Sequence, residues 1–275
     1  MTVAEALRRG TEFLERKGVP SPRVDAEHLL SRALGLTRVQ LYVEHDRPLT
    51  EPELAAARAL LERRGRREPL AYILGDWGFR RLTLRVDRRA LIPRPETEIV
   101  VERCLALLEG VAEPRVLDVG TGSGAIALAI ADEHPGASVT AIDASVEALQ
   151  LARENAESTG LAIELLEHDL TAGLPPGPWA LVVSNPPYVD PGEIDELQAE
   201  VRDWEPRVAL VGTGLTEAIA RGATGVLEPG GWLVLEVADG SAGRVCDLLT
   251  QLGFSGVCAT ADLAGRDRVV EGQWI

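Results

Sequence analysis

Val116-Leu117-Asp118-Val119-Gly120-Thr121-Gly122-Ser123-Gly124 is the stretch of this 275-residue chain that decides its fold. Its first four residues are mainly apolar and predict a buried strand. The three glycines that follow predict a tight turn, and the apolar run from Ala125 to Ile130 predicts a helix. A strand, a glycine turn and a helix in this order predict the first unit of an α/β sheet.

The glycine turn predicts a site for a nucleoside-type cofactor. A dinucleotide site spaces its glycines as G-x-G-x-x-G, whereas Gly120, Gly122 and Gly124 are spaced as G-x-G-x-G. Asp118 would repel a pyrophosphate, but it could hold the amino group of a methionine moiety directly or through water. The spacing and the acid therefore favour S-adenosyl-L-methionine over NAD, with Thr121 and Ser123 completing the turn.

Two later strand ends extend the candidate cofactor site. Asp143 ends the next predicted strand about 20 residues after the turn, where a carboxylate can accept both hydroxyls of a ribose. Asp169 and Leu170 follow the third predicted strand. We expect Asp169 to accept from an adenine amino group and Leu170 to pack on the ring.

Asn185-Pro186-Pro187-Tyr188 follows another apolar run, residues 179–184. The residue before a proline is held extended, so Asn185 should project from the strand end into a stiff loop. An Asn side-chain oxygen and a backbone carbonyl can accept both hydrogens of an –NH₂ group, and Tyr188 can cover a flat substrate. The four residues predict a site for a planar amine or amide, although Asn-Pro is also a common start of a plain turn.

From Arg115 onward, strand and helix patterns alternate, which predicts a seven-stranded, doubly wound, Rossmann-like α/β sheet. The expected strands are residues 115–119, 138–142, 162–167, 179–184, 231–237, 256–260 and 268–273. The expected helices are residues 96–109, 123–133, 145–158, 193–202, 214–228 and 241–252.

The first part of the chain has a different pattern. Residues 1–75 show helical spacing and two capping-box pairs, Thr2 with Glu5 and Thr50 with Glu53. Phe79, Leu82, Leu84 and Val86 alternate with polar residues, so we expect a β-hairpin linker over residues 76–94. We therefore expect a helical, substrate-docking domain over 1–75 and a catalytic domain over 95–275.

Composition limits the possible environments and partners. No apolar run is long enough to span a bilayer, and the charged N-terminus does not resemble a signal peptide. The three cysteines lack metal-site spacing, so we expect no metal site and a reducing cytoplasm. The net charge of −15 argues against general affinity for nucleic acid. Residues 58–94 differ, with eleven arginines and four acidic residues, which makes them a candidate docking segment.

Taken together, these motifs resemble those of class I S-adenosylmethionine-dependent methyltransferases. Asn185-Pro186-Pro187-Tyr188 is shared by enzymes that methylate adenine N6 or glutamine N5. The segment Leu91–Glu98, read LIPRPETE, and the helical N-terminus are similar to the HemK/PrmC family of peptide chain release factor glutamine methyltransferases. Trp204 stands where that family usually has Tyr or Phe.

The resemblance implies methylation of the glutamine in the Gly-Gly-Gln motif of release factors 1 and 2 by a monomer that uses S-adenosyl-L-methionine. Asn185, Pro186 and Tyr188 would be the catalytic residues, with Pro187 in the substrate site and Asn185 also near the cofactor. Three alternatives remain: ribosomal protein L3 as the acceptor, adenine-N6 methylation of nucleic acid, and a non-catalytic member of the family. Base flipping by a nucleic-acid enzyme would require a basic groove, which the charge disfavours.

Overall fold

The computed structural model describes all 275 residues, which divide into two compact units. The larger unit contains residues Trp77–Leu197 and Glu205–Ile275. The smaller, helical unit contains Met1–Asp76 and a second segment, Gln198–Trp204. The division between the units therefore falls within the expected hairpin, and the chain passes from one unit to the other three times.

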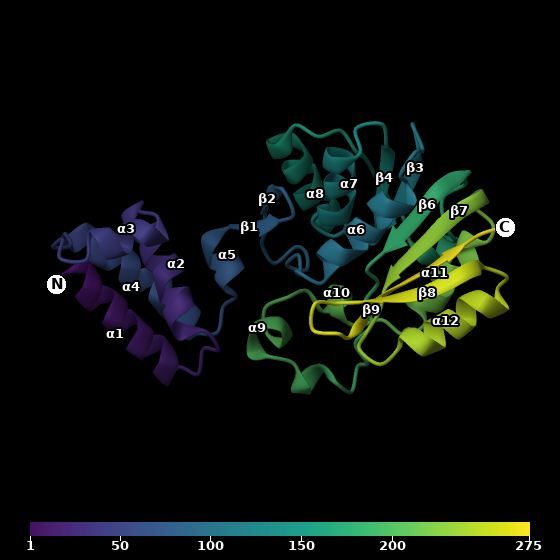
Figure 1. Cartoon of the computed structure of the whole chain (residues 1–275). Coiled ribbons are helices and arrows are strands. Elements are labelled where there is room, and N and C mark those ends of the chain that lie inside the picture. The colour runs from purple at the N-terminus through teal and green to yellow at the C-terminus, as the bar shows by residue number, and fades with distance from the viewer. The chain divides into compact units, whose positions relative to one another are not determined.

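The larger unit is built on the seven-stranded sheet that the alternating pattern predicted (Figure 1). The strand order is β5-β4-β3-β6-β7-β9-β8, with β9 antiparallel to both of its neighbours and the other pairs parallel. The strands are β3 (Arg115–Val119), β4 (Ser138–Asp143), β5 (Glu164–Glu167), β6 (Trp179–Ser184), β7 (Leu227–Glu236), β8 (Ser255–Ala261) and β9 (Asp267–Gln273).

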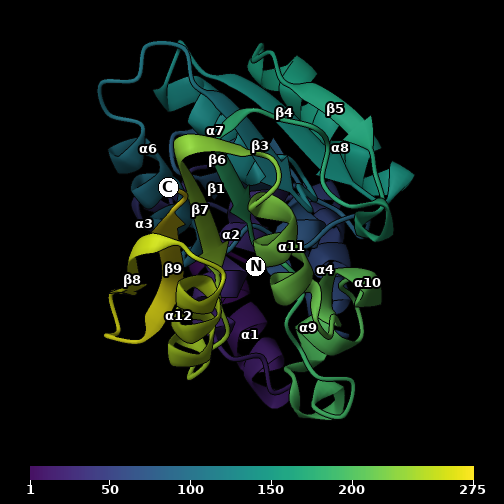
Figure 2. The same ribbon diagram turned by 90° about the vertical axis from the view of Figure 1, so that its right-hand side faces the viewer.

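Helices cover both faces of this sheet (Figure 2). Because successive residues of a strand point to opposite faces, Val116 and Leu181 join the core under α6 and α7, whereas Leu117 and Val182 join the core under α11 and α12. The helices are α6 (Thr97–Leu107), α7 (Ala125–Glu133), α8 (Val146–Thr159), α10 (Arg207–Leu210), α11 (Leu215–Ala223) and α12 (Ala242–Gln251). A two-stranded sheet of β1 (Asp76–Phe79) and β2 (Leu82–Arg85) confirms the hairpin.

The strand register brings the predicted motifs to one edge of the sheet. Val119, the last residue of β3, pairs with Ser184 at the end of β6 and with Ile142 near the end of β4. β4 and β6 lie on opposite sides of β3, so β3 and β6 flank the point where the strand order reverses. In open α/β sheets, ligands bind in the crevice beyond the carboxyl ends of strands at such a point.

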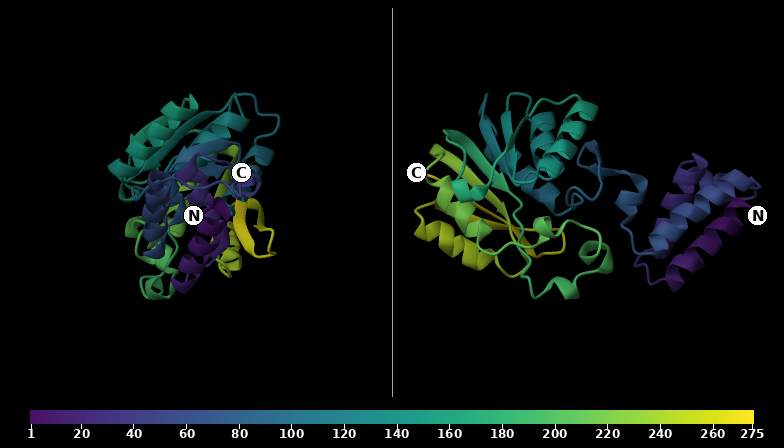
Figure 3. Two further views of the ribbon diagram at one scale, coloured as in Figure 1. Left: turned by 90° about the vertical axis from the view of Figure 1, so that its left-hand side faces the viewer. Right: turned by 180° about the vertical axis from the view of Figure 1, so that it is seen from behind.

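The helical unit forms two small apolar clusters of its own, and its helices are visible from behind in Figure 3. Both predicted capping boxes are present: the Thr2 and Thr50 hydroxyls accept from the Glu5 and Glu53 amides, and each Glu returns a bond to the cap. No helix of the chain has the length and apolar character needed to cross a membrane. The unit contains α1 (Val3–Arg16), α2 (Pro22–Leu34), α3 (Arg38–Val43), α4 (Glu51–Gly65), α5 (Leu70–Leu74) and α9 (Ala199–Arg202).

The prediction of a single helix over residues 193–202 was wrong. The structure has a 3₁₀ turn at Ile194–Glu196 and a separate four-residue helix, α9, in the helical unit. Glu200 of α9 is buried there, and its carboxylate binds Arg64 (2.8 Å) and Arg67 (2.5 Å). Leu197, between the two elements, is extended, and the ion pairs of Glu200 with Arg64 and Arg67 hold α9 in the helical unit.

Carboxylates of this chain, most of them outside the segment, neutralise much of the arginine-rich segment 58–94. At least eight of its eleven arginines form ion pairs with carboxylates, including Arg80 with Glu133 and Arg89 with Glu154. Most of the positive charge that suggested a docking segment therefore has a partner inside the chain.

Candidate active site

The glycine turn after β3 has the backbone shape that its spacing requires. Gly120, Gly122 and Gly124 all have positive φ, at 74°, 58° and 83°, which glycine adopts without strain. The amides of Gly120 and Thr121 donate to the carbonyl of Ile142 at 2.8 and 2.9 Å. A Cβ built on Gly120 would meet no atom within 4 Å, so the outer side of the turn is open to a ligand.

Asp143, at the end of β4, forms a hydrogen bond to the same turn. Its Oδ2 accepts from the Gly122 amide and its Oδ1 from the Ser145 amide, both at 2.9 Å. A carboxylate offers about four lone-pair positions, so two acceptor positions remain after these bonds. Asp143 also lines the cavity above the strand ends, which leaves it able to accept hydroxyl groups there.

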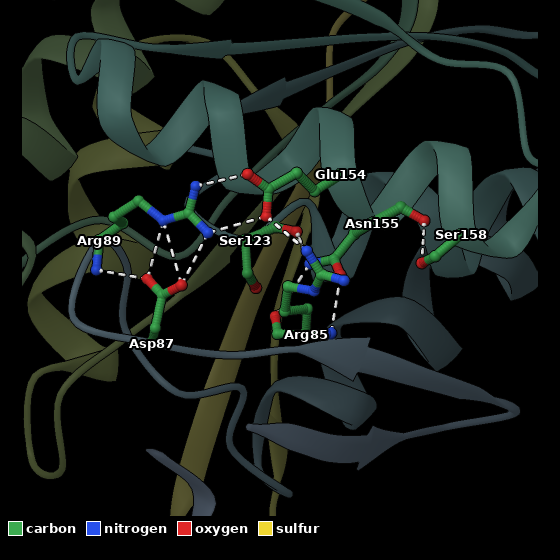
Figure 4. Close-up of polar contacts among 7 residues, drawn as sticks. All are labelled: Arg85, Asp87, Arg89, Ser123, Glu154, Asn155 and Ser158. Atoms are coloured by element: carbon green, nitrogen blue, oxygen red, sulfur yellow. Dashed lines mark hydrogen bonds and ion pairs between the residues drawn. The ribbon is translucent and has the colours of Figure 1, made fainter. Parts of the chain in front are cut away.

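Asn155 of α8 ties the glycine turn to the hairpin (Figure 4). Its Nδ2 donates to the carbonyls of Ser123 (2.9 Å) and Arg85 (3.1 Å), and its Oδ1 accepts from the Arg85 amide (2.7 Å). The side chain is fully buried. One amide therefore satisfies three backbone groups from β2 and the turn, next to the ion pairs of Arg89 with Asp87 and Glu154.

Replacing Asn155 with alanine is expected to lower the free energy of unfolding by about 3 kcal/mol, because three backbone groups lose their partner. Denaturant unfolding followed by circular dichroism measures this change. Glu157→Ala, on the exposed side of the same helix, is the matched control and should leave the stability unchanged. Equal stability of the two variants would contradict this structural role of Asn155.

Asp118 lies beneath the turn and does not line the cavity. It is completely buried, and its Oδ2 accepts from the Thr121 hydroxyl at 2.6 Å. Burial raises the pKa of Asp118 to about 7, although the Thr121 bond acts in the opposite direction. In this conformation Thr121, rather than Asp118, forms the cavity surface at this point.

Asn185 projects from the end of β6 into the same cavity. The preceding residue, Ser184, donates its hydroxyl to the carbonyl of Val119 at 2.7 Å, which binds the end of β6 to the end of β3. Asn185 Nδ2 donates to Thr97 Oγ1 at 3.3 Å. Pro187 also lines the cavity, whereas Pro186 is buried and Tyr188 lines a separate depression beside Val237 and Ser241.

The structure brings most of the predicted site residues to one cavity. Asp169 and Leu170 line it, although Asp169 Oδ1 also accepts from the Thr171 amide at 2.8 Å. Gly124, like Asp118, Pro186 and Tyr188, lies outside the lining. The predicted residues in the lining are Gly120, Thr121, Gly122, Ser123, Asp143, Asp169, Leu170, Asn185 and Pro187.

Two walls of the cavity come from segments that were not among the predicted site residues. The segment Arg89–Arg94 forms one wall and the residues from Pro206 to Ala209 contribute to another. Arg94 Nη2 binds Glu205 Oε1 at 2.5 Å and so joins these segments. The closely spaced prolines in Leu91–Glu98 signalled a stiff loop, but its nearness to the glycine turn depends on the tertiary fold.

The sheet topology and this cavity define a methyltransferase of the Rossmann-like class. Residues 97–201 match the methyltransferase small domain, and residues 5–75 match the PrmC N-terminal domain. The fold is similar to that of a 16S rRNA methyltransferase from T. thermophilus, with 20% identity and a TM-score of 0.53 over 73% of this chain and 50% of that one.

Similarity to curated proteins extends over the whole chain. The release factor glutamine methyltransferase of Geobacter sulfurreducens is 43% identical over 276 residues, which cover 99% of this chain and 96% of the relative. The protein of the same name from Deinococcus radiodurans is 42% identical, covering 98% of each chain. The chain therefore belongs to the release factor glutamine methyltransferase family, as its motifs indicated.

Proposed function

We propose that this chain transfers the methyl group of S-adenosyl-L-methionine to the side-chain amide nitrogen (N5) of the glutamine in the Gly-Gly-Gln motif of peptide chain release factors. The observation that carries this proposal is the pairing of β3 with β6. It places Asn185 and Pro187 in the same cavity as the glycine turn. A methyl donor and a planar amide can therefore share one site.

The lining residues fit the proposed cofactor. The open turn at Gly120 and Gly122 permits close approach of a ligand to the backbone. We assign Asp143 to the ribose hydroxyls, and Asp169 and Leu170 to the adenine edge and face. Thr121 would meet the methionine part, supported from below by Asp118. When bound, the cofactor supplies an electrophilic sulfonium methyl group.

The acceptor side must overcome the poor nucleophilicity of an amide nitrogen, whose lone pair is delocalised into the carbonyl. We assign Asn185 Oδ1 and the Pro186 carbonyl to accept the two N–H bonds of the glutamine. Those acceptors aim the nitrogen and stabilise the positive charge that develops on it. Tyr188 would cover the amide plane, for which its ring must move from the depression beside Val237 and Ser241 that it lines in the free protein. The methylated nitrogen then loses a proton without needing a dedicated base.

We propose release factors 1 and 2 as the methyl acceptors. We also propose that the enzyme is a monomer and acts in the cytoplasm. We assign docking of the rest of the factor to the helical unit. The names of the relatives support a release factor as acceptor. The net charge of −15 and the internal pairing of most arginines in 58–94 disfavour a nucleic-acid acceptor.

Incubation with labelled S-adenosyl-L-methionine and separate acceptors tests this function. We expect label in intact release factors, none in factors whose motif glutamine is changed to glutamate, and none in DNA. A free peptide with the motif should react with a much lower kcat/KM than the intact factor if the helical unit contributes docking. Label in ribosomal protein L3 or DNA, with none in release factors, would overturn the proposal.

A further inference from the structure

The carboxamide of Asn185 can serve the proposed reaction in only one of its two orientations. Its oxygen accepts hydrogen bonds and its –NH₂ group donates them, so the oxygen must face the cavity to accept from a glutamine amide. The two ends are almost equal in size, so packing alone discriminates weakly between the orientations. A neighbouring hydrogen-bond partner must make the choice.

Thr97 and Glu236 form that partner. Thr97, the first residue of α6, donates its hydroxyl to Glu236 Oε2 at 2.7 Å, and its oxygen accepts from Asn185 Nδ2 at 3.3 Å. Glu236 ends β7. The Thr97 and Glu236 residues are only 4% and 2% exposed, so bulk water does not compete for these bonds.

The direction of this chain of bonds follows from counting protons. An ionised carboxylate can only accept, so it takes the single hydroxyl proton of Thr97. The Thr97 oxygen then presents only lone pairs to Asn185, so Asn185 must donate a hydrogen bond to it from its –NH₂ group. Asn185 Oδ1 is thereby turned away from Thr97.

We propose that Thr97 and Glu236 are positioning residues that hold the Asn185 carboxamide with its oxygen toward the acceptor amide. This role rests on the proposed function, but the orientation itself is a property of the free protein. Neither residue needs to touch the acceptor for the chain of bonds to act.

Protonation of Glu236 would allow the direction of these hydrogen bonds to reverse. A neutral Glu236 can donate to Thr97, whose hydroxyl is then free to donate to Asn185 Oδ1, leaving the –NH₂ group toward the cavity. Burial raises the pKa of Glu236 to about 7, while Thr97, Arg268 and Arg94 lower it and Glu96 raises it. The Tyr188 phenol also faces this carboxylate, and burial together with the Glu236 charge raises the pKa of Tyr188. The required ionised form of Glu236 is present above the pKa of that carboxyl and is lost as pH falls through it. The kcat should therefore fall below about pH 7.

The decisive measurement compares Thr97→Val with Thr97→Ser in the intact protein. The valine variant, which is close in shape but cannot form hydrogen bonds, should lower kcat about 10²-fold, whereas the Kd of S-adenosyl-L-methionine should change less than about threefold. The serine variant should stay within about threefold of the wild type, because it keeps the hydroxyl. Near-normal kcat for the valine variant, or a loss shared by the serine variant, would overturn the proposal.

A second measurement does not depend on the acceptor. The side-chain ¹H–¹⁵N signals of Asn185, assigned by their loss in Asn185→Ala, should titrate with the apparent pKa of Glu236 in the wild type and in Thr97→Ser. They should not titrate in Thr97→Val or in Glu236→Gln. Signals that titrate equally in all four proteins would refute the positioning role. Failure of the wild type to methylate any release factor would refute the proposed function and leave this readout intact.

Discussion

Asn185→Ala is expected to lower kcat for glutamine methylation by about 10³-fold, the upper end of the loss seen when one preorganised polar group is removed from an active site. Alanine takes away the side-chain acceptor for the glutamine –NH₂ group, and water in its place is not held in a fixed direction. The glycine turn and Asp143 keep their mutual bonds, so the Kd of S-adenosyl-L-methionine should rise by less than about threefold. Steady-state transfer of a labelled methyl group and calorimetric cofactor titration measure the two quantities.

Glu193→Ala provides the matched control for this loss. Glu193 is exposed in the loop that follows the same strand, and its removal should leave kcat close to that of the wild type. Near-normal turnover of Asn185→Ala would remove Asn185 from the reaction. A large rise in the Kd would instead assign Asn185 mainly to cofactor binding.

Features set by short-range patterns could be predicted from the sequence. The β3 strand, the glycine turn and α7 lie within one short segment, and the positive φ values occur at the glycines themselves. Asn185 was placed at a strand end because the apolar run of β6 and the prolines specify it locally. The parallel part of the sheet, β5-β4-β3-β6-β7, then follows, because alternating strands and helices leave few other arrangements.

Features that depend on partners far away in the chain could not be predicted. α9 is held in the helical unit by Glu200, whose arginine partners Arg64 and Arg67 lie more than 130 residues earlier. The Thr97–Glu236 bond joins residues 139 positions apart. The sequence pattern around a residue indicates its helix or strand tendency, but it does not indicate which distant polar group will contact that residue.

Asp118 illustrates a third limit, because the sequence places it just before the glycine turn but does not show which way its side chain points. An acid two residues before a glycine turn could face a ligand or the protein interior. Strand alternation alone does not decide between these, because the backbone bends at the turn. In the structure the Thr121 hydroxyl binds the carboxylate and stands between it and the cavity surface.

Asp143→Ala is expected to raise the Kd of S-adenosyl-L-methionine by about 10²-fold. Two hydrogen bonds from a ribose to a charged acceptor contribute about 1.5 kcal/mol or more each, and about 1.4 kcal/mol corresponds to a tenfold change in Kd. The variant also releases the Gly122 amide, which loosens the turn and acts in the same direction. At saturating cofactor, kcat should fall much less, because Asn185 and its support by Thr97 are unchanged.

Calorimetric titration of both Asp143→Ala and Glu147→Ala separates a local contact from a general effect of charge. Glu147 lies in the first turn of α8, is exposed, and carries the same charge. If Asp143 acts by direct hydrogen bonding, only its replacement weakens binding. Similar Kd values for the two variants would show that Asp143 serves the turn and the start of α8 without holding the cofactor. The ribose would then have to be bound by other residues of the cavity.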